Sequence, residues 1–239
     1  GVPVNVTYRG VTYGPTGFAF SKEIVTDLLR GKLGFTGYVN SDTGIIGDRA
    51  WGLEQRTVPE RAAAAINGGT DIDVLTGGDG NDRIVGQQQN DSMFGGAGDD
   101  TLVWDPGDAN DLVEGQAGND TMEFNGAGGD ETFEASAVAR RLRFTRDLGN
   151  IVMDVDGTER VDLRALGGQD ATIVNDLSGT DVTKVDIDLA AAIGGGTGDG
   201  VADTITVNGT DGPDNVSVAA NEGVVDLTGL FTAVSISFS

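Results

Sequence analysis

A phrase of nine residues recurs between residues 68 and 133, and it restricts the fold more than any other feature. The phrase is G-G-x-G-x-D-x-U-x, in which U is a large apolar residue. Residues 77–85 and 95–103 fit it at every fixed position, and residues 115–123 miss only the second glycine. The sixth-position aspartates are spaced 9, 9, 9, 11 and 9 residues apart; they are Asp73, Asp82, Asp91, Asp100, Asp111 and Asp120. A period of this length indicates stacked repeats.

Each part of the phrase has a physical role. The glycines allow the positive φ angles and the close backbone approach of a tight loop. The aspartate ends the loop, and the residues after it form a short strand whose apolar residue points inward. Two phrases make one coil of 18 residues, and the predicted core is a row of apolar side chains, those of Leu75, Ile84, Met93, Leu102, Val113 and Met122.

These residues resemble the hemolysin-type, or RTX, calcium-binding β-roll repeat over about residues 68–133, with a solenoid-like continuation to residue 239. The resemblance implies a mainly β fold, a parallel β-roll or β-solenoid. It also implies Ca²⁺ ions between the loops of successive coils, with six to eight oxygens from aspartates and glycine carbonyls. Because the carboxylates repel one another without the cation, we expect folding to depend on calcium.

Stacking at intervals of 18 residues sorts the loops onto two sides. One side holds the three best copies, and its predicted calcium ligands are Gly77, Gly78, Asp79, Gly80, Asn81, Asp82, Gly95, Gly96, Gly98, Asp99, Asp100, Gly115, Gly118, Asn119 and Asp120. The other side holds degenerate copies, whose weaker candidates are Asp73, Asp91, Asp108 and Asp111. We therefore predict calcium mainly on the first side, in one site between Asp82 and Asp100 and another between Asp100 and Asp120.

Charge and composition favour a hard cation as the partner. The formal net charge is −23, and residues 71–239 carry 32 of the acidic residues but only eight of the basic ones. Such an acidic surface disfavours nucleic acid, because phosphates are repelled. The chain has no cysteine or histidine, so thiolate and imidazole metal sites are excluded, whereas calcium prefers oxygen. No apolar run approaches the roughly 20 residues of a membrane span.

The first 70 residues have a different character. Ser21 is a candidate N-cap for a helix over residues 22–30, an apolar segment leads into Asn40-Ser41-Asp42, and a capping box at residues 57–60 begins a second helix. With Leu33-Gly34-Phe35-Thr36-Gly37 and the run to Asp71, these residues resemble the last part of the catalytic barrel of glycoside hydrolase family 3. The resemblance implies that Asp42 occupies the position of that family's nucleophile.

The matched span is too short for a complete barrel. Eight strands and eight helices need about 250 residues. Retaining hydrolysis also needs a second carboxylic acid about 5 Å from the nucleophile, and sugar-binding side chains from other strands. We therefore expect a truncated α/β segment without catalytic activity. The alternative is a β-glucosidase-like retaining enzyme fragment with a calcium-binding tail, in which Asp42 is the nucleophile and a carbohydrate the substrate.

From residue 134 the strand rhythm persists while the glycine pattern fades, with alternating apolar residues about every ten residues as far as residues 234–238. Residues 167–170 and 211–214 are either ordinary β-turns or further calcium loops. The predicted organisation has three parts. Residues 1–70 form a truncated hydrolase-like α/β segment, residues 71–133 form calcium-binding β-roll repeats, and residues 134–239 form a β-solenoid continuation.

The predicted function is that of a non-catalytic calcium-binding module with a structural or interaction role. The RTX resemblance implies a secreted, extracellular bacterial protein that folds outside the cell, where calcium is abundant, although this chain shows no N-terminal signal peptide. A surface adhesion module is a third alternative, for which the sequence offers no specific patch.

Overall fold

The computed structural model describes residues 6–8, 11–13, 23–33 and 74–237. The predicted nucleophile Asp42, the weaker ligand Asp73, the predicted second helix and the boundary at residues 70/71 lie outside these ranges. Strands β1 (Val6–Tyr8) and β2 (Val11–Tyr13) pair antiparallel. A π-helix, η2 (Glu23–Lys32), covers the helix predicted over residues 22–30. No helix in the described ranges has the length and apolar character needed to cross a membrane.

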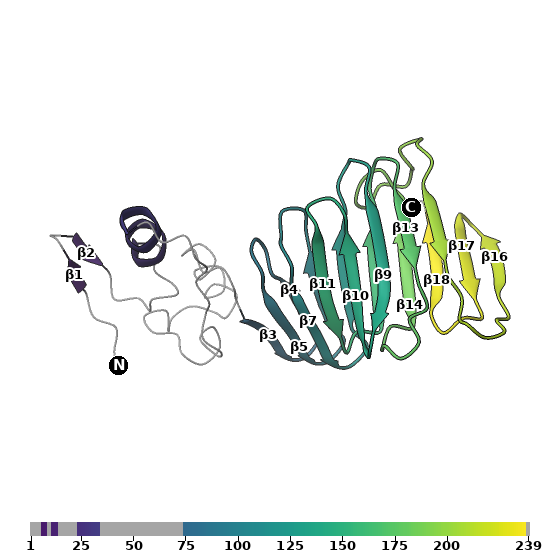
Figure 1. Cartoon of the computed structure of the whole chain (residues 1–239), viewed down its shortest axis with the longest axis horizontal. Coiled ribbons are helices and arrows are strands. Elements are labelled where there is room, and N and C mark those ends of the chain that lie inside the picture. The colour runs from purple at the N-terminus through teal and green to yellow at the C-terminus, as the bar shows by residue number, and fades with distance from the viewer. Residues whose placement is uncertain (1–5, 9–10, 14–22, 34–73, 238–239) are drawn as a thin grey trace.

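Residues 74–237 form two eight-stranded sheets that face each other (Figure 1). In hydrogen-bonded order, sheet 1 contains β15 (Thr204–Val207), β13 (Ala171–Val174), β9 (Thr132–Val138), β10 (Arg141–Arg146), β11 (Ile151–Asp156), β7 (Leu112–Ala117), β5 (Ser92–Ala97) and β3 (Val74–Asp79). Sheet 2 contains β16 (Ser217–Asn221), β17 (Val224–Thr228), β18 (Ala233–Ser237), β14 (Lys184–Asp188), β12 (Arg160–Arg164), β8 (Thr121–Asn125), β6 (Thr101–Trp104) and β4 (Arg83–Val85).

Strands β3 to β8, the first six of residues 74–237 in chain order, form the predicted parallel β-roll. The chain alternates between the sheets, so β3, β5 and β7 pair in parallel in sheet 1 while β4, β6 and β8 do so in sheet 2. The pairing sets Leu75 against Met93 and Met93 against Val113. All six apolar residues of the predicted core row are at most 8% exposed, which confirms that they point inward.

An antiparallel meander interrupts the roll after β8. The chain enters sheet 1 at β9, beside the later strand β13, and then returns through β10 to β11, which pairs in parallel with β7. Sheet 2 has no such insertion, because β8 pairs directly with β12. The loop from β11 to β12 therefore takes the next place after the loop from β7 to β8, although the meander separates them in sequence.

Large aromatic side chains fill the core beside this meander. The rings of Trp104 and Phe124 are stacked with centroids 4.2 Å apart, and Phe144 packs on Phe124 at 4.8 Å. Phe133 meets the edge of Phe124 at 6.0 Å. All four residues are fully buried, so they contribute much of the apolar burial of this region.

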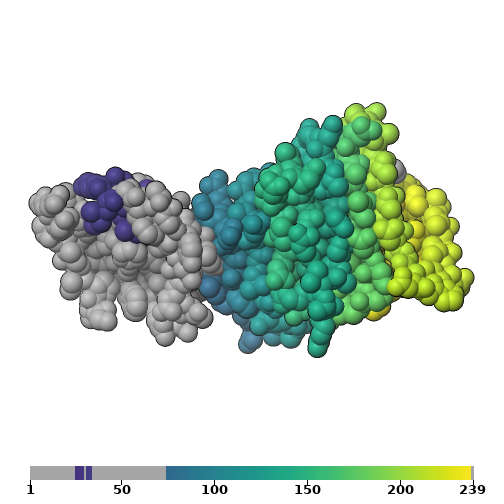
Figure 2. All heavy atoms as spheres, viewed as in Figure 1, coloured from purple at the N-terminus to yellow at the C-terminus, as the bar shows by residue number. Residues whose placement is uncertain are grey.

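The strands predicted beyond residue 134 are present, but not all belong to parallel coils. Strands β12, β13, β14 and β15 continue the parallel pairing, whereas β16, β17 and β18 form an antiparallel ribbon. Strand β18 joins this ribbon to sheet 2 by parallel pairing with β14. Figure 2 shows residues 74–237 as one continuous packed body.

Candidate metal centre

Two rows of loops connect the sheets. The first four loops that run from sheet 1 to sheet 2 are called row A, and the loops that run from sheet 2 to sheet 1 are called row B. Row A contains residues 77–82, 95–100, 115–120 and 157–159, and row B contains residues 86–91, 105–111, 126–131, 165–170 and 189–203. Row A thus contains the three best copies of the repeat.

A ladder of hydrogen bonds joins the sixth-position residues of row A. The backbone N–H of Asp82 donates to Oδ1 of Asp100 at 2.8 Å, and the N–H of Asp100 donates to Oδ1 of Asp120 at 2.8 Å. The N–H of Asp120 donates to Oε2 of Glu159 at 2.7 Å. One carboxylate oxygen of Asp100, of Asp120 and of Glu159 is therefore fixed by the preceding coil, which sets the direction of the other oxygen.

The Oδ2 atoms of these aspartates are buried without a hydrogen-bond donor from the described residues. Oδ2 of Asp82, Asp100 and Asp120 accepts no hydrogen bond from the described residues. An uncompensated buried carboxylate oxygen is costly unless a cation meets it. Burial raises the pKa of Asp120, and the charges of Asp100 and Glu159 raise it further, while the hydrogen bond from the Asp100 backbone opposes the shift.

The first glycine of each repeat leaves space for these oxygens. A methyl group added to Gly77 would lie 2.5 Å from the carbonyl oxygen of Gly95 and 2.7 Å from Oδ2 of Asp82. The same pair of oxygens occurs one coil on, where a methyl group on Gly95 would meet Oδ2 of Asp100 and, at 2.6 Å, the carbonyl oxygen of Gly115. Calcium accepts such carboxylate and carbonyl oxygens at 2.3–2.6 Å. The donor set therefore fits calcium.

The other predicted residues of row A shape the loops. The N–H of Asp99 donates to Oδ1 of Asn81 at 2.9 Å, and the N–H of Asn119 donates to Oδ1 of Asp99 at 3.0 Å, so these side chains hold neighbouring coils together. The predicted glycines at the second and fourth positions have positive φ; they are Gly78, Gly80, Gly96, Gly98 and Gly118. Asp79 is exposed at the start of its loop.

Row B repeats the ladder in part. The N–H of Asp91 donates to Oδ1 of Asp111 at 2.8 Å, and a methyl group on Gly86 would lie 3.1 Å from Oδ2 of Asp91 and 3.5 Å from Oδ2 of Asp111. Burial raises the pKa of Asp111 to about 7, against the effect of the bond from the Asp91 backbone. Asp108 instead accepts the N–H of Asp105 at 2.8 Å within its own turn.

A second part of row B lies beyond the meander. The N–H of Glu131 donates to Oδ1 of Asp170 at 2.8 Å, and the N–H of Asp170 donates to Oδ1 of Asp203 at 3.0 Å. Burial raises the pKa of Asp170 to about 7. The nine-residue pattern is incomplete here, although Gly167 and Gly168 precede Asp170, and the sequence pattern did not single out Asp203. Glu131 and Asp203 lie two places before an apolar strand residue, Phe133 and Ile205, as the repeat aspartates do, whereas Asp170 lies two places before Thr172.

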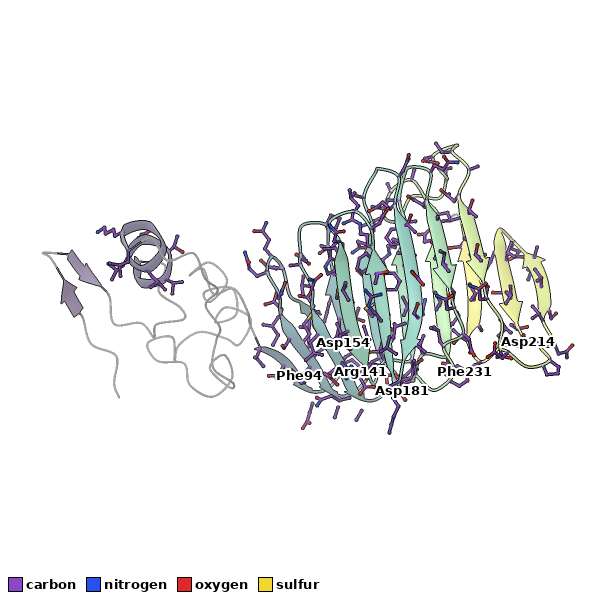
Figure 3. The ribbon with its side chains drawn as sticks, in the orientation of Figure 1. Phe94, Arg141, Asp154, Asp181, Asp214 and Phe231 are labelled. Atoms are coloured by element: carbon purple, nitrogen blue, oxygen red, sulfur yellow. The ribbon has the colours of Figure 1, made fainter. Side chains whose placement is uncertain are left out.

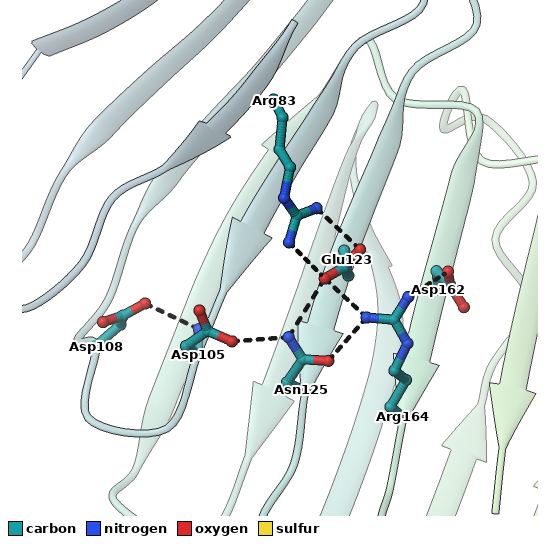
Figure 4. Close-up of polar contacts among 7 residues, drawn as sticks. All are labelled: Arg83, Asp105, Asp108, Glu123, Asn125, Asp162 and Arg164. Atoms are coloured by element: carbon teal, nitrogen blue, oxygen red, sulfur yellow. Dashed lines mark hydrogen bonds and ion pairs between the residues drawn. The ribbon is translucent and has the colours of Figure 1, made fainter. Parts of the chain in front are cut away.

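Carboxylates elsewhere on the sheets pair with basic side chains. On the outer face of sheet 2, Glu123 contacts Arg83 at 3.0 Å and Arg164 at 2.7 Å (Figure 4). Burial opposes the ionisation of Glu123, but the two arginines outweigh it and lower its pKa to about 2. On sheet 1, Arg141 contacts Asp154 at 2.5 Å (Figure 3).

The described residues place no comparable basic side chain on the row A aspartates. Within the described ranges, no ion pair with lysine or arginine involves its sixth-position aspartates. Nor do residues 74–237 gather three acidic side chains into a cluster that could hold a metal alone. A cation in row A therefore needs backbone carbonyls as well as carboxylates, as the contacts around Gly77 and Gly95 provide.

Residues 67–102 and 107–130 match the family described as RTX calcium-binding nonapeptide repeat (4 copies). These two ranges are similar to RTX repeats, and together they are called the RTX array. The array covers the first three loops of row A, whereas residues 157–159 lie outside the matched ranges. The family therefore supports calcium as the cation of row A.

The chain also resembles part of an enzyme. It is 46% identical over 72 compared positions, which cover 26% of this chain, to β-glucosidase C of Emericella nidulans and to the probable β-glucosidase C of Aspergillus flavus. The probable β-glucosidase C of Aspergillus oryzae is 44% identical over the same length. The chain spans only 11–12% of the length of these relatives.

Among solved structures, the extracellular lipase LipA of Serratia marcescens matches with 14% identity and a TM-score of 0.31. The match covers 70% of this chain and 38% of the lipase.

Proposed function

We propose that this chain is a secreted calcium-binding module whose row A coils fold as they bind calcium, and that its role is structural or in protein interaction. One observation carries the proposal. In successive coils, a buried Oδ2 atom and a glycine carbonyl oxygen both lie next to the first glycine of the repeat, where a larger residue's side chain would overlap them. Bound calcium supplies the positive charge that these oxygens lack. The proposed ligands are the row A residues predicted from the repeat, in sites between Asp82 and Asp100 and between Asp100 and Asp120.

The proposal extends to row B and to the domain organisation. Asp91 and Asp111 have the same ladder bond as the row A aspartates, so they are proposed as a further, weaker site. The hydrolase-like segment, the RTX array and the solenoid continuation are proposed as three units over residues 1–70, 71–133 and 134–239. Secretion is proposed because RTX repeat proteins are typically exported.

A calcium titration of the full chain tests the proposal. Far-ultraviolet circular dichroism is measured in EGTA and then with calcium up to millimolar concentrations. The expected result is a gain of β signal and of thermal stability with calcium. Magnesium at equal concentration is the control, because it demands a smaller octahedral site and gives up water reluctantly. No response to calcium, or an equal response to magnesium, would contradict the proposal.

A second candidate function is that of a β-glucosidase-like fragment with a calcium-binding tail. It rests on the identity of 46% over 72 residues, and it assigns Asp42 as the nucleophile and a carbohydrate as the substrate. Hydrolysis of an aryl β-glucoside by the full chain, lost in D42A, is the expected result if this function holds. No turnover by the unaltered chain would rule it out.

A further inference from the structure

The ladder of row A continues past the last RTX repeat. Strand pairing sets Arg160 against Thr121 and Thr121 against Thr101, so Glu159 occupies the place that Asp120 and Asp100 hold in their coils. The carboxylate of Glu159 accepts the N–H of Asp120 at 2.7 Å, as Asp120 accepts that of Asp100. Glu159 thus acts as a sixth-position residue, although residues 157–159 lack the nine-residue pattern.

The oxygen arrangement of the earlier coils is also repeated here. A methyl group added to Gly115 would lie 2.7 Å from Oδ2 of Asp120 and would overlap the carbonyl oxygen of Gly157. The same two kinds of oxygen meet at Gly77 and Gly95. Asp120 is 0% exposed, and its Oδ2 atom accepts no hydrogen bond from any described residue. The polar atom that faces this space is therefore fully buried and uncompensated.

We propose a third calcium site in row A, between residues 115–120 and residues 157–159. Its ligands are the Asp120 carboxylate and the Gly157 carbonyl, and Glu159 positions Asp120 and adds negative charge. The site rests on the proposed calcium-binding function, and two of its residues lie outside the matched RTX repeats. Because residues 157–159 form a shorter loop with fewer carbonyls, this site is the weakest of row A.

The position of the site gives it a specific role. Asp120 precedes β8 and Gly157 follows β11, so the two ligands come from opposite ends of the meander formed by β9, β10 and β11. An ion bound there holds the returning strand β11 beside β7. Calcium therefore couples the end of the RTX array to the first coil of the continuation.

The number of calcium ions bound by the full chain tests this site. Native mass spectrometry gives the ion count, and isothermal titration calorimetry gives the affinity of each step. E159Q keeps an oxygen that can accept the Asp120 N–H, so it removes mainly charge. E159Q is expected to lose one ion, or to bind the weakest ion at least about tenfold less tightly. The matched control is E222Q at an exposed turn, which is expected to bind calcium as the unaltered chain does.

A crystal structure of the unaltered chain grown with calcium gives a second test, which stands even if E159Q fails to fold. An anomalous peak between Asp120 and Gly157, in addition to peaks between the earlier loops, is the expected result. Peaks confined to the earlier loops, or an E159Q that binds calcium as the unaltered chain does, would overturn the third site alone. No calcium bound by the unaltered chain in either experiment would overturn the proposed function itself.

Discussion

Replacing Asp100 by asparagine is expected to stabilise the calcium-free chain and to weaken its response to calcium. Asp100 is 1% exposed and lies in row A between Asp82 and Asp120. Its Oδ1 atom accepts the N–H of Asp82, and its backbone N–H donates to Asp120. The asparagine oxygen can keep the first bond, and the second uses only the backbone of residue 100. D100N therefore removes mainly the negative charge.

The size of the expected change in the free energy of unfolding follows from the stacking of the coils. Adjacent strands lie about 4.8 Å apart, and two carboxylates at that separation repel by about 3 kcal/mol at an effective dielectric constant of about 20. Imperfect replacement of one hydrogen bond costs about 1 kcal/mol, so the expected net gain without calcium is about 1–3 kcal/mol. With free calcium at 100 times its Kd, each lost site removes about 2.7 kcal/mol. D100N is therefore less stable than the unaltered chain in calcium.

Urea unfolding followed by tryptophan fluorescence measures both effects, because Trp104 is fully buried. The free energy of unfolding is compared in EGTA and in calcium for the unaltered chain, D100N and E222Q. Glu222 is exposed, so E222Q is expected to change stability by no more than about 0.5 kcal/mol under either condition. Equal destabilisation of D100N in both buffers would refute the reasoning, because a structural role does not depend on the ion.

Three further predictions concern groups outside row A. Burial raises the folded-state pKa of Asp111 and Asp170 from 3.8 to about 7. Their protonation therefore stabilises the calcium-free chain fully below about pH 4, and this stabilisation is lost as the pH rises through about 7. The melting temperature in EGTA is therefore expected to be higher at pH 5 than at pH 8, and a flat profile would contradict this. E123Q leaves Arg83 and Arg164 without their shared carboxylate, and urea titration is expected to show a loss of about 1–2 kcal/mol that is equal with and without calcium. Phe124→Ala opens a cavity in the aromatic cluster and is expected to cost about 3–5 kcal/mol in both buffers, whereas a loss seen only in calcium would argue against a purely packing role.

The sequence predicts the β-roll well because one pattern specifies both its loops and its strands. Each glycine position sets a tight turn, and each apolar residue two places after the aspartate sets an inward side chain. The register of β3 to β8 and the burial of Met93, Leu102 and Met122 follow from that spacing, and the structure confirms both.

The meander could not be predicted in the same way. An apolar strand about every ten residues is compatible with a parallel coil and with an antiparallel hairpin. The local signs of reversal are Gly149 and Asn150, which both have positive φ in the turn between β10 and β11, and Ala139 in the turn before β10. The pairing of Glu159 with Asp120 depends on this return of the chain, so no fixed sequence interval reveals it.

The buried carboxylates lie in two different electrostatic environments. In row B, where the repeat loops give way to the meander, the guanidinium of Arg146 pairs with the buried Glu131 and lies 5.3 Å from the centre of the Trp104 ring. This cation is part of the chain, so it is present whatever the calcium concentration. In row A the described residues give Asp100 and Asp120 backbone N–H donors but form no ion pair between lysine or arginine and Asp82, Asp100 or Asp120. We therefore expect the Arg146–Glu131 pair to stabilise the meander at any calcium concentration and the stability of the row A coils to vary with the ion, and the loop that contains Glu159 lies where the two regions meet.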